Sequence, residues 1–386
     1  MNASWQIGDV GRSEVRTLIV PTFTTEGGET VYNAPIAYQT WGELNETADN
    51  CIVVCHALTG NTDVQDWWGG VLGTGRALDP SQHFVVCLNV PGSPYGSISP
   101  LSLDQRSGRR FGVAFPRFTI RDAVRLHRLA LEQIGVRRIR LAVGGSLGGM
   151  QAVEWCFHTD FVDRGAAIAC GANHSAWCIG WSSAQRAAIC ADPTWDNGNY
   201  HPDQQPGVGL ALARRIAMMT YRSAGEYDSR FGRQSMKPGE TFSVESYLDY
   251  QGDKLVSRFD ANCYLALTSL MDSHDIERER VDCTHSSPVV VVAVSTDVLY
   301  PPAEQQQLVS ILGNATYEEL ESPYGHDAFL IEQDRLNEIL LRWLNLAETR
   351  AFQKDHAEDN LPRPTYSVTP QLADTISGAK PADVVG

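Results

Sequence analysis

The hydrophobic positions along the chain follow two different patterns. Apolar residues at 17–20 and 35–38 lie on either side of a Gly27-Gly28 pair, which predicts two antiparallel strands joined by a turn. From residue 51 onward, short runs that are apolar at nearly every position replace this pattern. They cover residues 52–55, 84–89, 139–143 and 289–294, and a further strand is expected near 316–320. Such strands are typical of a parallel sheet that is covered on both faces.

Helical patterns fill the intervals between these strands. The helix expected at about 119–134 has a signal at each end. Thr119 can cap its first turn together with Asp122, and Gly135 follows its last residue. Further helices are expected at 149–158, 302–312 and 327–344.

The alternation of strand and helix stops between about residues 175 and 285. This stretch has several helical patterns and no convincing buried strand. We therefore predict an α/β fold, a mostly parallel sheet with helices on both faces. Its core is discontinuous, at 15–174 and 286–347, with a helical lid inserted at 175–285. Residues 350–386 contain four prolines and no apolar periodicity, which predicts an irregular tail.

Composition and charge exclude several classes of function. The 386-residue chain carries a formal net charge of −15, from 46 acidic and 31 basic residues, which argues against binding nucleic acid. It contains no apolar run of about 18 residues, so we expect no membrane span. Residues 1–16 offer no apolar core for a signal peptide, so a cytoplasmic location is expected. The nine cysteines include no CxxC pair and no metal-ligand spacing, which predicts free thiols and no metal site.

A glycine-rich segment supplies the strongest chemical signal. Residues 144–149 read Gly-Gly-Ser-Leu-Gly-Gly directly after the strand at 139–143 and fit the pattern G-x-S-x-G. This pattern forms a tight strand-to-helix turn that exposes a serine hydroxyl. A passive serine in a glycine-rich turn is the alternative. The strand before it and the helix after it favour Ser146 as a nucleophile, and with the inserted helical lid they predict an α/β-hydrolase fold.

A nucleophilic serine needs a base and a carboxylate that orients the base. In this fold the three residues occur in the chain order Ser, Asp, His. Asp297 lies three residues past the strand at 289–294, and His326 lies in the loop after the strand near 316–320. Each alone could be a turn or surface residue, but their combined positions predict a catalytic triad of Ser146, Asp297 and His326.

When a serine attacks a carbonyl group, the carbonyl oxygen becomes negative. This oxyanion needs two backbone N–H donors. One is expected from Leu147, directly after the nucleophile. The other is expected from the loop at residues 56–60, where Leu58 is the candidate. His56 on the same loop could compete as the base, but its position favours a role in the fold.

Several motifs together resemble the homoserine O-acetyltransferase family. They are residues 56–60, 67–68, 73–78, 144–151, 213–214, 221–223, 299–302 and 322–330. The resemblance extends from about residue 15 to about residue 347. It implies acetyl transfer from acetyl-CoA to the hydroxyl of L-homoserine in methionine synthesis, with a ping-pong mechanism. It also implies a helical lid, a homodimer and no cofactor besides the acyl donor, and it assigns the same Ser146, Asp297 and His326.

The resemblance also implies how the acceptor is recognised. Homoserine is a zwitterion, whose carboxylate favours an arginine and whose ammonium favours a carboxylate. Arg214 would bind the carboxylate and Asp327 the ammonium, with Tyr221 nearby. Arg214 and Tyr221 are seven residues apart and would share a helix face. By spacing alone, a solvated helix arginine and an N-cap aspartate are the alternatives.

One loop departs from the common pattern of the family. Residues 91–97 read Pro-Gly-Ser-Pro-Tyr-Gly-Ser and look more like the loop of fungal members, among which relatives acylate other alcohols. A serine O-acyltransferase and a succinyl-CoA-using homoserine acyltransferase therefore stay open as alternatives. An esterase would leave Arg214 and Asp327 without a role.

Overall fold

A sheet of eight strands forms the centre of the computed structural model, which describes residues 13–235, 241–280 and 284–358. Its order is β1-β2-β4-β3-β5-β6-β7-β8. β1 and β2 are antiparallel to their neighbours, and the other six strands run parallel. The strands are β1 (Arg16–Thr24), β2 (Thr30–Trp41), β3 (Cys51–Cys55), β4 (Phe84–Leu88), β5 (Ile139–Gly145), β6 (Gly165–Ile168), β7 (Val289–Val294) and β8 (Ala315–Leu320).

The sheet confirms the two predicted strand patterns. β1 and β2 form the antiparallel pair, with Val20 opposite Ala34 and Phe23 opposite Val31 in the core. β3, β4 and β7 are buried at every position, which confirms a sheet covered on both faces. The sequence analysis missed β6, because its four residues, Gly-Ala-Ala-Ile, are too few and too small to form a conspicuous apolar run.

The helix that comes after β4 has the end signals that the sequence predicted. In α2 (Ile120–Ile134), the Thr119 hydroxyl accepts from the Asp122 N–H at 3.1 Å, and the Asp122 carboxylate accepts from the Thr119 N–H at 3.1 Å. Gly135 ends the helix with φ of 102°, a conformation that favours glycine. The other core helices are α1 (Val64–Trp68), α3 (Leu147–Trp155), α9 (Pro302–Leu312), α10 (Ala328–Ile331) and α11 (Gln333–Glu358).

Two expectations for the C-terminal part were wrong. The single helix expected at 327–344 is divided at Glu332, whose φ and ψ of −86° and 46° are not helical, into α10 and α11. Residues 350–358, assigned to an irregular tail, are helical and continue α11. They are rich in helix formers and contain neither glycine nor proline before Pro362, so helix propensity extends the element without an apolar face. Residues 359–386, the rest of the expected tail, lie outside the described residues.

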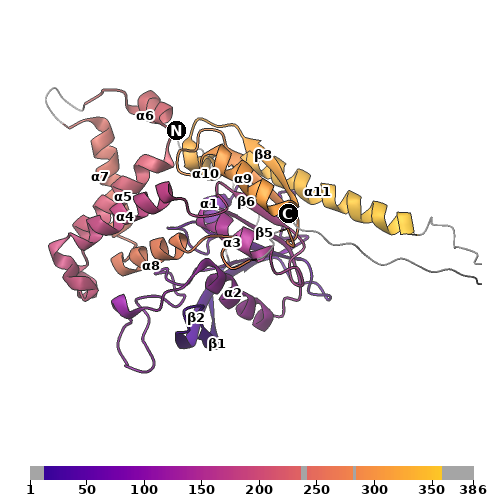
Figure 1. Ribbon diagram of the computed structural model, residues 1–386, viewed down its shortest axis with the longest axis horizontal. Coiled ribbons are helices and arrows are strands. Elements are labelled where there is room, and N and C mark those ends of the chain that lie inside the picture. The colour runs from indigo at the N-terminus through magenta and orange to yellow at the C-terminus, as the bar shows by residue number, and fades with distance from the viewer. Residues whose placement is uncertain (1–12, 236–240, 281–283, 359–386) are drawn as a thin grey trace, which may run out of the picture. The chain divides into compact units, whose positions relative to one another are not determined.

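A helical insertion separates β6 from β7. Its helices are α4 (Ala176–Cys190), α5 (Gly207–Tyr221), α6 (Ala224–Phe231), α7 (Ser243–Val256) and α8 (Ala261–Asp272). They gather beside the sheet, with α5 packed between α4 and α7 (Figure 1). None of the described residues of this insertion belongs to the sheet. Short 3-10 turns occur at Gly112–Ala114, Pro193–Gly198, Pro202–Gln204 and Gly325–Asp327.

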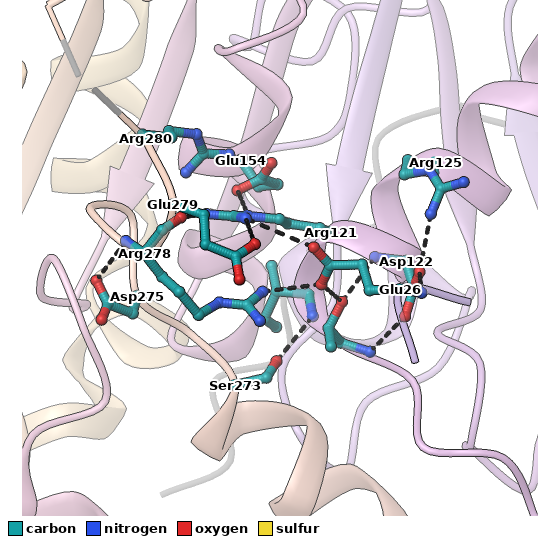
Figure 2. A network of polar contacts seen from close by, with 12 residues as sticks. Glu26, Arg121, Asp122, Arg125, Glu154, Ser273, Asp275, Arg278, Glu279 and Arg280 are labelled. Carbon is teal, nitrogen blue, oxygen red and sulfur yellow. Dashed lines mark hydrogen bonds and ion pairs between the residues drawn. The ribbon is translucent and has the colours of Figure 1, made fainter. Parts of the chain in front are cut away.

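An ionic network fixes the chain where it returns from the insertion to the core (Figure 2). Arg278 pairs with Glu26, at the turn between β1 and β2, at 2.8 Å. Arg280 pairs at 2.5 Å with the buried Glu154 on α3, and Arg121 on α2 lies 3.9 Å from the same carboxylate. A buried carboxylate needs such partners, since an unpaired buried charge is costly. The network therefore attaches the end of the insertion to the helix that begins beside Ser146.

Candidate active site

Ser146 occupies the turn between β5 and α3. Its φ of 59° and ψ of −124° lie in a region that non-glycine residues rarely adopt, so the backbone there is strained. The turn also passes very close to the end of β3. A Cβ on Gly144 or Gly148 would stand 2.5 or 2.0 Å from the Cys55 carbonyl oxygen, so only glycine fits at either position. The geometry is that of the tight turn expected for G-x-S-x-G.

A short hydrogen bond joins Asp297 and His326. Nδ1 of His326 lies 2.7 Å from Oδ2 of Asp297, and both side chains are buried. The other carboxylate oxygen of Asp297 accepts from the N–H groups of Leu299 at 2.8 Å and Tyr300 at 2.9 Å. Nε2 of His326 is buried and has no hydrogen-bond partner among the described residues. The ring therefore donates from Nδ1 to Asp297 and keeps Nε2 available to take a proton.

The surroundings of His326 raise the pKa of its imidazole. Burial works to lower this pKa, because a charged ring is disfavoured away from water. The charge of Asp297 and its hydrogen bond favour the protonated ring, and the charge of Asp327 adds to this effect. The net shift of the pKa is upward from 6.5, so this environment favours the imidazolium form of His326.

A small pocket of about 110 Å³ brings most of the candidate residues together. Its lining comes from the loop after β3, the turn before α3, helix α5 and the loop after β8. The lining residues are Ala57, Leu58, Thr59, Ser146, Arg214, Tyr221, His326, Asp327, Phe329 and Leu330. Of the eight residues that the sequence analysis singled out, only Leu147 and Asp297 are outside this lining. Leu147 directly follows Ser146, and Asp297 is hydrogen-bonded to His326.

Arg214 is a cation without a carboxylate partner in this pocket. Its guanidinium carbon lies 5.3 Å from the centre of the Tyr221 ring, and that ring lies 5.8 Å from the His326 ring. No ion pair joins Arg214 to any residue that the structure describes. The side chain is half-buried and lines the pocket, and a solvated helix arginine stays the alternative. An anionic group that enters the pocket would meet an unneutralised guanidinium close to Ser146.

Asp327 is held by an arginine that the sequence analysis had not singled out. Arg222 Nε lies 3.0 Å from Oδ2 of Asp327. Asp327 stands at the N-terminus of α10, but its side chain makes no capping hydrogen bond, so the alternative role as a helix cap is wrong. Oδ1 of Asp327 has no ion-pair partner within the described ranges. Arg222 belongs to the motif at residues 221–223, but its position in the motif did not reveal its partner.

Two backbone N–H groups are available for an oxyanion. The N–H of Leu147 is the first in α3, where helical N–H groups have no acceptor within the helix. Leu58 lines the pocket from the opposite loop. Neither N–H donates a hydrogen bond to another residue in the part of the chain that the structure describes.

Aromatic rings surround His326, and sequence reasoning had not assigned them. The ring centres of Tyr300 and Phe329 lie 5.4 and 5.7 Å from that of His326. Trp68 Nε1 donates to the Phe329 carbonyl at 2.9 Å. Tyr300 and Trp68 belong to motifs on which the family resemblance rests. That membership was the only signal in the sequence that these two residues lie near the site. These contacts restrict the orientation of the imidazole.

The remaining chemistry of the described residues is limited. Residues 13–235, 241–280 and 284–358 contain no group of three or more His, Cys, Asp or Glu side chains placed to hold a metal ion. No helix within these ranges is both long and apolar enough to cross a membrane.

Comparison with known proteins defines first the class and then the family. A family model described as alpha/beta hydrolase fold matches residues 50–333, and the chain belongs to this class. The homoserine O-acetyltransferase of Salinibacter ruber is 54% identical over 340 residues, covering 85% of this chain and 97% of that protein. The homoserine O-acetyltransferase of Chloroherpeton thalassium is 49% identical over 337 residues, with 86% of each chain covered. The chain belongs to the homoserine O-acetyltransferase family.

A solved structure agrees with this assignment. The crystal structure of homoserine O-acetyltransferase from Bacillus anthracis superposes with a TM-score of 0.79 at 25% identity, covering 86% of this chain and 98% of that chain.

The raised pKa of His326 predicts a pH dependence for acylation. The base must be neutral, so the rate of acylation should increase with pH through a midpoint above 6.5. Asp297→Asn should lower the rate and move the midpoint to lower pH, because it removes the charge that favours imidazolium. Asp327→Asn is the control and should move the midpoint less. Rates of acylation across pH test this, and an unchanged or higher midpoint in Asp297→Asn would contradict it.

Proposed function

We propose that this chain transfers an acetyl group from acetyl-CoA to the hydroxyl of L-homoserine, as a step of methionine biosynthesis. The observation that best supports this proposal is the pocket. It is lined by Ser146, by His326 with its free Nε2, and by Arg214 with its unpaired guanidinium. A nucleophile with a base accounts for acyl transfer. An unpaired cation beside them accounts for an acceptor with a carboxylate.

Acylation is the first half of the proposed reaction. Ser146 Oγ attacks the thioester carbonyl while His326 Nε2 takes the hydroxyl proton. The N–H groups of Leu58 and Leu147 donate to the oxygen that becomes negative. The carbon–sulfur bond then breaks, and the coenzyme A thiolate leaves with the proton from His326. Asp297 keeps the imidazole in the required tautomer throughout.

Transfer to the acceptor is the second half. The hydroxyl of homoserine gives its proton to His326 and attacks the acetyl-Ser146 ester. The tetrahedral intermediate collapses, and the proton returns to Ser146 Oγ as it leaves. Arg214 binds the carboxylate of the acceptor, while Oδ1 of Asp327 is available to its ammonium. Tyr221 lies between Arg214 and His326 and fixes the direction from which the acceptor approaches.

Exclusion of water distinguishes transfer from hydrolysis. Ser146 is 6% exposed, and α5 of the helical insertion contributes to the lining of its pocket. We propose that the insertion acts as a lid that limits access of water to the ester. Esterase activity is the alternative from another class, and the structure of esterase E22 superposes with a TM-score of 0.77. At 23% identity, with 86% of this chain and 100% of that chain covered, that likeness shows the fold alone.

The pocket also bears on the choice of donor. Succinyl-CoA would bring a second carboxylate to a pocket of about 110 Å³, in addition to that of the acceptor. Among the described residues that line the pocket, Arg214 is the one arginine, and Arg222 is already paired with Asp327. This supports acetyl as the acyl group.

We also propose that the chain forms a homodimer through its helical insertion. Val208, Leu212 and Met219 are 81%, 45% and 47% exposed at positions that share one face of α5. Trp177 on α4 and Tyr250 on α7 are also exposed, and both helices neighbour α5. An apolar surface of this kind supports a protein contact. Sedimentation of the purified chain as a 42.5 kDa monomer would contradict it.

A cytoplasmic location is proposed on the state of the cysteines. Eight free cysteines occur in the described residues, and seven of them are buried. Unpaired thiols support a reducing compartment. Recovery of the protein in an extracellular or periplasmic fraction would contradict this.

A panel of donors and acceptors tests the proposed reaction. Acetyl-CoA with homoserine should give O-acetylhomoserine at least about tenfold faster than succinyl-CoA with homoserine, acetyl-CoA with serine, or acetyl-CoA with water. The reason is that Arg214 is the one arginine among the described residues that line this small pocket, and that the proposed lid limits access of water. Product formation is followed by mass spectrometry. Serine, succinyl-CoA or water as the preferred partner would contradict the proposal, and each result would identify a different alternative.

Arg214→Ala should impair use of the acceptor and spare acylation. Loss of a charge-assisted contact of roughly 1.5–3 kcal/mol corresponds to about a tenfold to hundredfold lower kcat/KM for homoserine. Acylation by acetyl-CoA should change by less than about threefold. Arg215→Ala is a matched control, because Arg215 is adjacent on α5 but pairs with Asp249 outside the pocket at 2.7 Å. Normal use of homoserine by Arg214→Ala would contradict the recognition role.

A further inference from the structure

The peptide unit between Ala57 and Leu58 is fixed by two hydrogen bonds. The Ala57 carbonyl oxygen accepts from Nδ1 of His56 at 2.9 Å and from the Gly60 N–H at 2.9 Å. In a planar trans peptide the C=O and the following N–H point in opposite directions. Whatever holds the Ala57 carbonyl therefore also sets the direction of the Leu58 N–H. Leu58 lines the pocket that contains Ser146.

His56 can hold this carbonyl only as one tautomer. Its Nε2 accepts a hydrogen bond from the Val90 N–H at 3.0 Å, so the ring proton is on Nδ1 and is donated to Ala57. The side chain is fully buried, and burial lowers the pKa of His56 to about 4. The ring therefore stays neutral at the pH at which the enzyme works. Val90 belongs to the loop after β4, so this loop selects the tautomer.

Gly60 leaves the space that this arrangement needs. A Cβ at residue 60 would lie 3.1 Å from Cβ of His56 and 3.3 Å from its Nδ1. Both distances are tighter than most real Cβ contacts. The imidazole and the turn that ends at Gly60 are therefore packed closely behind the Leu58 peptide.

We propose that His56 is a positioning residue for the oxyanion hole, where it holds the Ala57 carbonyl and thereby directs the Leu58 N–H toward the acyl oxygen. The proposal rests on the proposed function, in which Leu58 is one of the two donors. His56 touches no reacting atom. Its hydrogen bond fixes the orientation of the donor and polarises the peptide, which strengthens the N–H as a donor. Loss of a whole oxyanion donor costs about 100- to 1000-fold in kcat, so loss of its orientation should cost less.

Two variants of His56 and one matched control separate positioning from general stability. His56→Leu removes both hydrogen bonds and keeps an apolar side chain in the space. His56→Asn keeps a donor near the position of Nδ1. His127 on α2 is the control, because it is also buried, its pKa is also lowered to about 4, and it contacts Asn89 instead of Ala57. His127→Leu removes a buried imidazole that contacts the loop after β4 at Asn89, and it leaves the oxyanion peptide untouched.

The experiment measures acylation of the full-length enzyme by acetyl-CoA in the absence of acceptor, by rapid quench, together with Tm and the pH profile. For His56→Leu we expect a maximal acylation rate about tenfold to hundredfold lower than that of the wild type. The acetyl-CoA concentration that gives half of this rate should change by less than about threefold. The midpoint of the pH profile should not move, because His326 remains the base. His56→Asn should recover at least about fivefold of the loss. His127→Leu should lower Tm and acylate within about threefold of the wild type.

Several results would overturn the inference. They are wild-type acylation by His56→Leu, equal losses in His56→Leu and His127→Leu, and a shifted pH midpoint in the His56 variants. If His56→Leu does not fold, His56→Gln takes its place and His127→Gln is its control, because a glutamine amide reaches the position of Nε2 beside the Val90 N–H and not that of Nδ1. There, acylation by His56→Gln no lower than that of His127→Gln overturns the inference. Ser146→Ala separates the two claims, because its continued acylation contradicts the proposed function and not merely the role of His56.

Discussion

The carbonyl oxygen of Cys55, at the end of β3, approaches the Ser146 turn so closely that neither Gly144 nor Gly148 could carry a Cβ. The chain can pass this close only because both positions are glycine, and Ser146 lies between them with φ of 59°. The close approach also places the loop after β3 beside the start of α3, because β3 and β5 are neighbours in the sheet. The nucleophile and both proposed oxyanion donors thus depend on one backbone contact between two adjacent parallel strands.

A second close approach connects the helical insertion to the loop that carries His326. Gly325 has φ of 67°, and a Cβ there would stand 2.6 Å from the Ser223 backbone nitrogen. The Ser223 hydroxyl donates to the Pro323 carbonyl at 2.5 Å, and Arg222 pairs with Asp327. The insertion is therefore held against the same loop that supplies the proposed base. The residues proposed to recognise the acceptor and those proposed to carry the chemistry meet because these two segments share contacts.

Features that depend on strand order were largely predictable from the sequence, whereas features that depend on packing were not. Ser146, Asp297 and His326 could be placed because this fold carries them in loops after particular strands, although their catalytic roles stay predictions. The pairing of Arg222 with Asp327 could not be foreseen, since it depends on how α5 ends against a loop about 100 residues away. β6 escaped notice because four small residues give no periodic signal. The hydrogen bond from His56 to the Ala57 carbonyl could not be foreseen either, because the spacing of residues does not show where a side chain points.

The central claim is that Ser146 carries the acyl group between donor and acceptor. The most direct measurement is mass spectrometry of the digested protein after rapid quench with acetyl-CoA alone. The account predicts one acetyl group on the peptide that contains Ser146, which disappears on addition of homoserine as O-acetylhomoserine forms. Product formation with no adduct at any quench time, or an adduct on another residue, would contradict it and leave His326 as a base for direct transfer.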